Sequence, residues 1–112
     1  MGNTMDGLWT AEFGSSTGMF GGGVVIFQDG KILGGDGNYF YTGRFTLKEH
    51  AFEATLTVSP FIEGAESVFK TVGQVLTLEL AGSLTQEGRA VAQGHPKGMP
   101  NLNFGVKLTK RT

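Results

Sequence analysis

The residue types that most often carry out chemistry in proteins are sparse in this sequence. Both histidines, His50 and His95, lie beside residues that favour turns, and the chain has no cysteine. A protein zinc site needs three or four ligands held close together. We therefore interpret both histidines as exposed turn residues, and the sequence predicts no metal site and no cofactor.

The acidic side chains offer one pair that could work together, Glu63 and Glu66, in a segment of irregular pattern. A catalytic acid–base pair must reach its substrate from defined positions, so a polar loop is the better explanation of these residues. No serine stands in the Gly-x-Ser-x-Gly context that presents a nucleophile. The glycine runs at 21–23 and 34–37 lie between predicted strands, whereas phosphate-binding loops lead into a helix. We predict a protein without enzymatic activity.

Hydrophobic residues alternate with polar ones along most of the chain, a pattern typical of half-buried strands. Asp29-Gly30 is the clearest hairpin signal, because both residues accept the positive φ of a type I′ turn. The pattern predicts eight strands at about 8–13, 19–28, 31–33, 38–47, 52–59, 76–81, 89–94 and 102–109. Short turns make neighbours antiparallel, and eight strands can close. We expect an all-β, eight-stranded up-and-down barrel, with a β-sandwich as the alternative.

The same pattern defines one domain over residues 5–112, preceded by a possible disordered extension at residues 1–4. Within the second strand, the glycine run at 21–23 suggests a bend or bulge of the kind found at barrel corners. Proline and glycine interrupt the pattern at residues 60–73, where we expect a long loop with a short helical turn near 65–69.

Two apolar features suggest binding surfaces. Alternation places Val25, Phe27 and Phe40 on the outer wall of the second to fourth strands, which predicts a homodimer contact. The alternative is core packing, with a bulge that changes the phase of the strand. The second feature is a set of side chains at the predicted barrel mouth: Phe61, Ile62, Val68 and Phe69. They could form a lid, but we favour a plug, because small barrels need sealed ends.

Composition narrows the function classes further. The 112 residues include nine Lys and Arg against ten Asp and Glu, for a formal net charge of -1. Nucleic-acid binding usually needs a basic face, so we expect no nucleic-acid partner. No apolar run approaches the ~20 residues of a membrane helix, and the first residues lack the regions of a signal peptide. We expect a cytoplasmic protein that has no membrane partner.

Several motifs together resemble the GrlR-like proteins, which are negative regulators of type III secretion and uncharacterised bacterial relatives. The matching segments are Asp6-Gly7-Leu8-Trp9-Thr10, Gly21-Gly22-Gly23-Val24-Val25, Asp29-Gly30, Gly34-Gly35-Asp36, Tyr39-Phe40-Tyr41-Thr42-Gly43, Ser67-Val68-Phe69 and Val106-Lys107-Leu108. Gly-Gly-Asp followed by Tyr-x-Gly is the most specific of them. The resemblance implies a lipocalin-like barrel that forms homodimers.

The resemblance also implies a partner, since the regulator of that family sequesters a transcriptional activator. Its binding signature is an acidic run on the turn after the fourth strand. Here that turn reads Leu47-Lys48-Glu49-His50, and only Glu49 keeps the acidic character. Lys48 reverses the charge, so a contact built on acidic residues would lose its electrostatic complement. Lys48, Glu49 and His50 are the candidate partner-binding turn.

Two functions therefore stand open. The first is a regulatory or adaptor protein that acts by binding another protein, such as a transcriptional activator. The second is a lipocalin-like carrier of a small apolar ligand inside the barrel. Bulky inward residues such as Trp9 and Phe52 would fill the interior, whereas Ala11, Ala54 and Ala92 would leave room.

Overall fold

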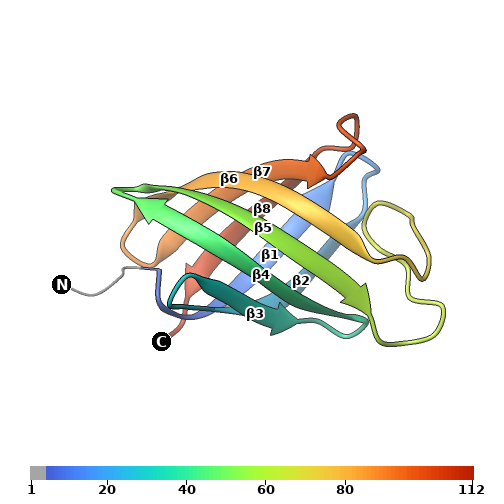
Figure 1. Ribbon diagram of the computed structural model, residues 1–112, viewed down its shortest axis with the longest axis horizontal. Coiled ribbons are helices and arrows are strands. Elements are labelled where there is room, and N and C mark those ends of the chain that lie inside the picture. The colour runs from blue at the N-terminus through green and yellow to red at the C-terminus, as the bar shows by residue number, and fades with distance from the viewer. Residues whose placement is uncertain (1–4) are drawn as a thin grey trace.

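The computed structural model describes residues 5–112 and shows a closed barrel of eight antiparallel strands (Figure 1). The strands are β1 (Gly7–Ser15), β2 (Phe20–Gln28), β3 (Lys31–Gly35), β4 (Tyr39–Lys48), β5 (Ala51–Pro60), β6 (Leu76–Gln86), β7 (Arg89–Pro96) and β8 (Phe104–Lys110). Each strand pairs with the next along the chain, and β8 closes on β1. The up-and-down barrel is thus confirmed, and the sandwich alternative is wrong. The predicted extension at residues 1–4 lies outside the described residues.

Alternating burial explains why these segments form strands. In β5, Phe52, Ala54 and Leu56 are buried, while Glu53 and Thr55 are exposed. Successive side chains of a strand point to opposite faces, so one face of each strand packs inside the barrel and the other meets solvent. Among residues 5–112, no helix is long and apolar enough to span a membrane.

Turn chemistry sets the connections at one end of the barrel. Asp29 and Gly30 have φ values of 52° and 79°, as a type I′ hairpin requires, so the predicted hairpin is confirmed. The turns at 29–30, 49–50 and 87–88 lie at the same end as the start of β1 and the C-terminus, called here the turn end (Figure 1). The longer connections at 16–19, 36–38, 61–75 and 97–103 lie at the opposite end, the loop end.

An aromatic cluster seals the turn end. Met5 and Trp9 are fully buried, and the Trp9 indole N–H donates to the Met5 carbonyl at 2.8 Å. The Trp9 ring meets Phe27 edge-to-face with centroids 5.9 Å apart, and Phe27 meets Phe45 in the same way at 5.1 Å. Such pairs contribute about 0.5–1.5 kcal/mol each beyond area burial. This cluster closes one end of the barrel interior.

The phase of β2 corrects the predicted dimer surface. Val25 and Phe27 are only 5% and 3% exposed and belong to the core. Val25 pairs directly with Trp9, and Phe27 pairs with the buried Ile32; residues directly opposite in a sheet share a face. The prediction that Val25 and Phe27 lie on the outer wall is therefore wrong. Phe40 is 47% exposed, as expected.

The glycine run at 21–23 does not form the expected bulge. Pairing between β1 and β2 is continuous from Gly7 to Gly14, and the register shift occurs in β6, between Leu84 and Gln86. Gly21 and Gly23 instead make space inside the barrel. A Cβ on Gly21 would lie 2.7 Å from the Phe13 ring, and a Cβ on Gly23 would lie 2.9 Å from the Tyr41 hydroxyl. These two glycines therefore accommodate aromatic side chains.

Candidate functional site

The barrel interior contains a cavity of about 290 Å³ between the aromatic cluster and the loop end. Side chains from all eight strands line it, and most of them are apolar. Its space comes from small residues, because Ala11, Ala54 and Ala92 face inward at positions where larger side chains would meet. An engineered apolar cavity of ~150 Å³ can hold benzene. The cavity here is about twice that size, so the bulky inward residues do not fill the barrel.

The loop at 61–75 covers the cavity at the loop end. Phe69 is buried, and its ring lies 5.5 Å from the ring of Phe104, which in turn lies 5.6 Å from that of Phe13. Phe69 and the half-buried Val68 both line the cavity. These two residues plug the mouth in the way that the sequence predicts.

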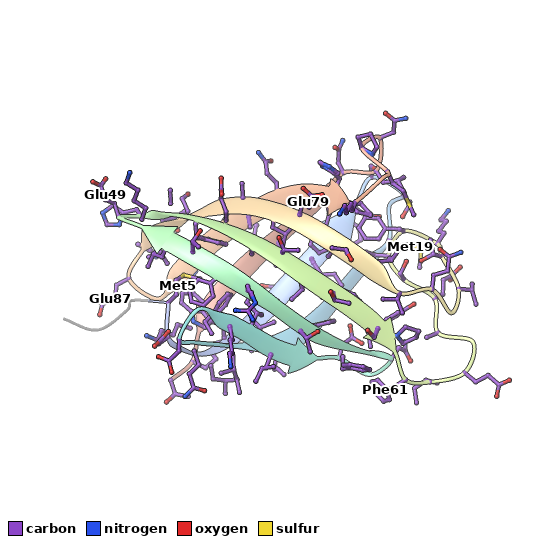
Figure 2. The ribbon with its side chains drawn as sticks, in the orientation of Figure 1. Met5, Met19, Glu49, Phe61, Glu79 and Glu87 are labelled. Carbon is purple, nitrogen blue, oxygen red and sulfur yellow. The ribbon has the colours of Figure 1, made fainter. Side chains whose placement is uncertain are left out.

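Phe61 and Ile62 do not belong to this plug. They are 55% and 47% exposed, and Figure 2 shows Phe61 at the outer edge of the loop end. The prediction is wrong for these two residues, because they belong to the first part of the loop, which leaves β5 and runs outside the barrel before Ala65 turns inward.

The predicted helical turn at 65–69 is also absent from the described chain. Ser67 organises this segment instead: its hydroxyl is 2.7 Å from that of Thr71, and it accepts the backbone N–H of Phe69 at 3.1 Å. An isolated bridge between Glu66 and Val72 closes a small loop. Serine and threonine hydroxyls compete with helical hydrogen bonds in this way, so a compact turn replaces the helix.

Two hydroxyl groups tie this loop to the end of β1. Ser15 and Thr17 both donate to the carbonyl oxygen of Val68, the Thr17 bond being 2.5 Å long. A further hydrogen bond anchors the start of the loop, where the Phe61 N–H donates to the Asn38 carbonyl at 2.9 Å. The loop thus covers the cavity and is held in place by the hydroxyl groups of Ser15 and Thr17, called here the hydroxyl latch.

A polar cluster lies beside the cover, built around Asp36. One Asp36 carboxylate oxygen accepts the backbone N–H groups of Asn38 and Tyr39, both at 2.8 Å, and the other accepts the Tyr41 hydroxyl. Burial, and then the hydrogen bond to Asp36, raise the pKa of Tyr41. Tyr41 therefore stays neutral and donates to Asp36 at physiological pH.

Tyr39 and Tyr41 differ in the hydrogen bonding of their hydroxyl groups. Tyr39 is 4% exposed, and its hydroxyl is buried with no hydrogen-bond partner among the described residues. Burial raises the pKa of Tyr39, with further contributions from the charges of Asp36 and Glu66. Tyr39 is therefore a neutral phenol whose polar atom is unsatisfied.

The candidate partner-binding turn lies far from this cavity. Lys48, Glu49 and His50 are exposed at the turn end, and Glu49 adopts φ of 59°. Figure 2 shows Glu49 at the end of the molecule opposite Met19 and Phe61. The structure thus separates the two predicted sites by the length of the barrel.

His95 lies in a strand, which corrects its assignment to an exposed turn. It is half-buried in β7 and pairs with Glu79 of β6 on the outer wall. Arg44 and Glu53 line the same shallow outer depression. Within residues 5–112, no group of three or more histidine, cysteine or acidic residues could hold a metal ion.

Comparison with solved structures supports the fold assignment. The chain is similar to a redesigned β-barrel, with a TM-score of 0.71 and 13% sequence identity over 97% of this chain and 93% of the other. At that identity the likeness shows the fold alone. No family model matches this sequence, and neither does any curated protein sequence.

Proposed function

We propose that this protein binds a small apolar molecule inside the barrel, as a carrier or a sensor would. The observation that carries the proposal is the apolar cavity of about 290 Å³. Ligand sites are typically concave, mostly apolar, and about 300–1,000 Å³ in volume. At about 290 Å³, the cavity lies just below the lower limit of that range, which is the size expected for a small ligand.

The construction of the loop end supports the same proposal. Phe69 covers the cavity from a loop that is tied to β1 through the Val68 carbonyl. Opening such a cover breaks few hydrogen bonds to the strands, and loops of this kind commonly regulate access to binding sites. The sealed turn end leaves the loop end as the route of entry.

Native mass spectrometry of freshly purified protein tests the proposal. We expect an extra mass that is released on denaturation, or uptake of a medium-chain alcohol by ligand-free protein. A matched pair of variants then locates the site. Ala11→Leu adds bulk to the cavity wall and should abolish uptake, whereas Ala81→Leu adds the same bulk on the exposed outer wall and should not. Uptake that is equal in both variants would contradict binding in the cavity.

A second candidate function is protein binding through the outer wall of β2 to β4. The observation that favours it is a contiguous exposed apolar set, here called the outer patch: Val24, Ile26, Leu33 and Phe40. Ile26 lies directly opposite Leu33, while Val24 and Phe40 flank Gly35. Exposed patches of this kind often mark protein interfaces.

Under this second proposal, the outer patch supports a homodimer or contact with a protein such as a transcriptional activator, in the manner of a GrlR-like regulator. The turn Lys48–His50 remains its predicted partner-binding element. Sedimentation equilibrium of the wild type and Leu33→Glu tests the dimer. A dimer that the substitution dissociates would support the patch, and a wild-type monomer at high concentration would contradict it.

A further inference from the structure

The cavity is polar at one end only. Its floor consists of apolar side chains such as Phe27, Ile32 and Phe52. Its polar lining residues all lie at or near the loop end: Asp36, Asn38, Tyr39, Tyr41, Glu66 and Ser67. A ligand with an apolar body and a single polar group would therefore have one favourable orientation, with its polar group beneath the cover.

The charges at this end select against anions. Asp36 and Glu66 are the acidic residues of the lining, and none of the described lining side chains is a lysine, arginine or histidine. A bound carboxylate would lose its hydration without gaining a cationic partner, and it would lie near two like charges. A fatty acid is thus a poor match for this cavity, although its tail would fit.

The hydrogen bonds at this end also disfavour a cation. The Asp36 carboxylate already accepts the N–H groups of Asn38 and Tyr39 and the Tyr41 hydroxyl. Glu66 is exposed, so water weakens, without abolishing, its effect on a bound charge of either sign. The cavity therefore offers a buried ammonium group no carboxylate that is both buried and free of hydrogen-bond partners.

Tyr39 supplies the group that is missing a partner. Its hydroxyl is buried, lies on a residue that lines the cavity, and has no hydrogen-bond partner among residues 5–112. Buried polar groups without partners are rare in folded proteins and disfavour the state that leaves them unpaired. A neutral oxygen or nitrogen on a bound ligand would satisfy this hydroxyl.

We infer that the ligand is an uncharged amphiphile, whose hydroxyl, carbonyl or amide group bonds to Tyr39 beside Asp36 while its apolar body extends toward the aromatic floor. This inference rests on the proposed ligand-binding function and deepens it. By comparison with the benzene-sized cavity, the ligand has roughly ten to twelve non-hydrogen atoms.

Calorimetric titration with decanol, decanoate and decylamine at neutral pH tests the inference, because the three probes share one chain length and differ in head-group charge. We expect decanol to bind about tenfold or more tightly than either charged probe, since burying an unpaired charge is costly. Equal binding of decanol and decanoate, or tighter binding of a charged probe, would overturn the inference and leave ligand binding in place. Binding of none of the three would refute both.

Two variants sharpen the test. Tyr39→Phe should weaken decanol binding about three- to tenfold through loss of one hydrogen bond, without lowering the melting temperature, since the hydroxyl has no partner in the free protein. Glu66→Gln should leave decanol binding unchanged and strengthen decanoate binding, because it removes one of the two acidic charges. Unchanged decanol affinity in Tyr39→Phe, or unchanged decanoate affinity in Glu66→Gln, would count against the assigned contacts.

Discussion

The two ends of the barrel are formed by the same alternating strands but are closed in different ways. At the turn end, the described strands are joined by short hairpins, and the fully buried Met5 and Trp9 fill the interior. At the loop end, long connections cover a cavity, and the Tyr39 hydroxyl is left unpaired. The turn end is packed as a protein core, whereas the loop end keeps space and unsatisfied polarity.

Because of this difference, the residues that stabilise the fold most and the residues proposed to bind a ligand lie at opposite ends of the barrel. Well-packed aromatic clusters lose much free energy when truncated, while a loop that is joined to the strands by few hydrogen bonds opens at lower cost than the sheet itself. A barrel built in this way keeps its fold while its mouth opens. The comparison therefore predicts that substitutions at the turn end mainly affect stability, and that substitutions at the loop end mainly affect access and binding.

The largest expected effect is that of Trp9→Ala. Trp9 is fully buried, and it contacts both Met5 and Phe27. Removing a buried Trp side chain typically costs about 3–5 kcal/mol, so we expect a loss of this size in the free energy of unfolding. Denaturant titration measures it. A loss smaller than that of Phe69→Ala, the matched loop-end variant, would contradict the predicted difference between the two ends.

Phe69→Ala is the matched truncation at the loop end. Phe69 is also buried against an aromatic partner, Phe104, but it lies on a loop that can relax and it borders a space that already exists. We expect a smaller loss of about 2 kcal/mol, together with faster release of bound decanol. Chemical denaturation and stopped-flow release measure the two effects. Unchanged release kinetics would argue against Phe69 as a cover.

Tyr41→Phe tests the polar cluster through its pH dependence. Removal of one hydrogen-bond partner from Asp36 should cost about 1–3 kcal/mol at neutral pH. The pKa of Tyr41 is raised from 10.0 in the folded state, so its contribution to stability is fully present below pH 10.0 and is lost as the pH rises above that value.

Free energies of unfolding on both sides of pH 10.0 measure this linkage. Wild type should lose stability above that pH, and Tyr41→Phe should lose less. Tyr39→Phe serves as the control at neutral pH, because its hydroxyl has no partner to lose. Parallel pH profiles for wild type and Tyr41→Phe would show that the Tyr41 titration is not linked to folding.

The smallest expected effect is that of Thr17→Val in the hydroxyl latch. The substitution removes the hydrogen bond to the Val68 carbonyl, and Ser15 retains its own bond to the same oxygen. We expect a loss of about 0.5–1 kcal/mol, confined to the cover. Hydrogen exchange should quicken for amides of residues 61–75 alone. Faster exchange at the turn end as well would mean that the two ends are not independent.

The sequence predicted the strands well, and the reason is local. Alternation in β5 and the Asp29-Gly30 hairpin depend only on neighbouring residues and their turn preferences. The phase of β2 could not be predicted in the same way, because Val24 to Phe27 are apolar on both faces. Only pairing with Trp9 and Ile32 decides which residues face inward.

The candidate site was predicted only in part. Val68 and Phe69 were expected at the mouth, but nothing in the sequence distinguishes them from Phe61 and Ile62, which are equally apolar and are exposed. In the sequence, Asp36 stands out only as part of the Gly34-Gly35-Asp36 motif, and the structure shows that it accepts two backbone N–H groups of the following turn. Its contact with the Tyr41 hydroxyl was missed, although the two residues are close in the chain.

By itself, the sequence determined an antiparallel barrel of eight strands, because periodicity and turn chemistry act over a few residues at a time. The tertiary structure alone decided that the barrel is packed at one end and hollow at the other. A cavity depends on the summed volumes of side chains such as Ala11, Ala54 and Ala92, which meet across strands distant in the chain. A short stretch of sequence cannot predict this total volume, because these strands face one another only after β8 has closed on β1.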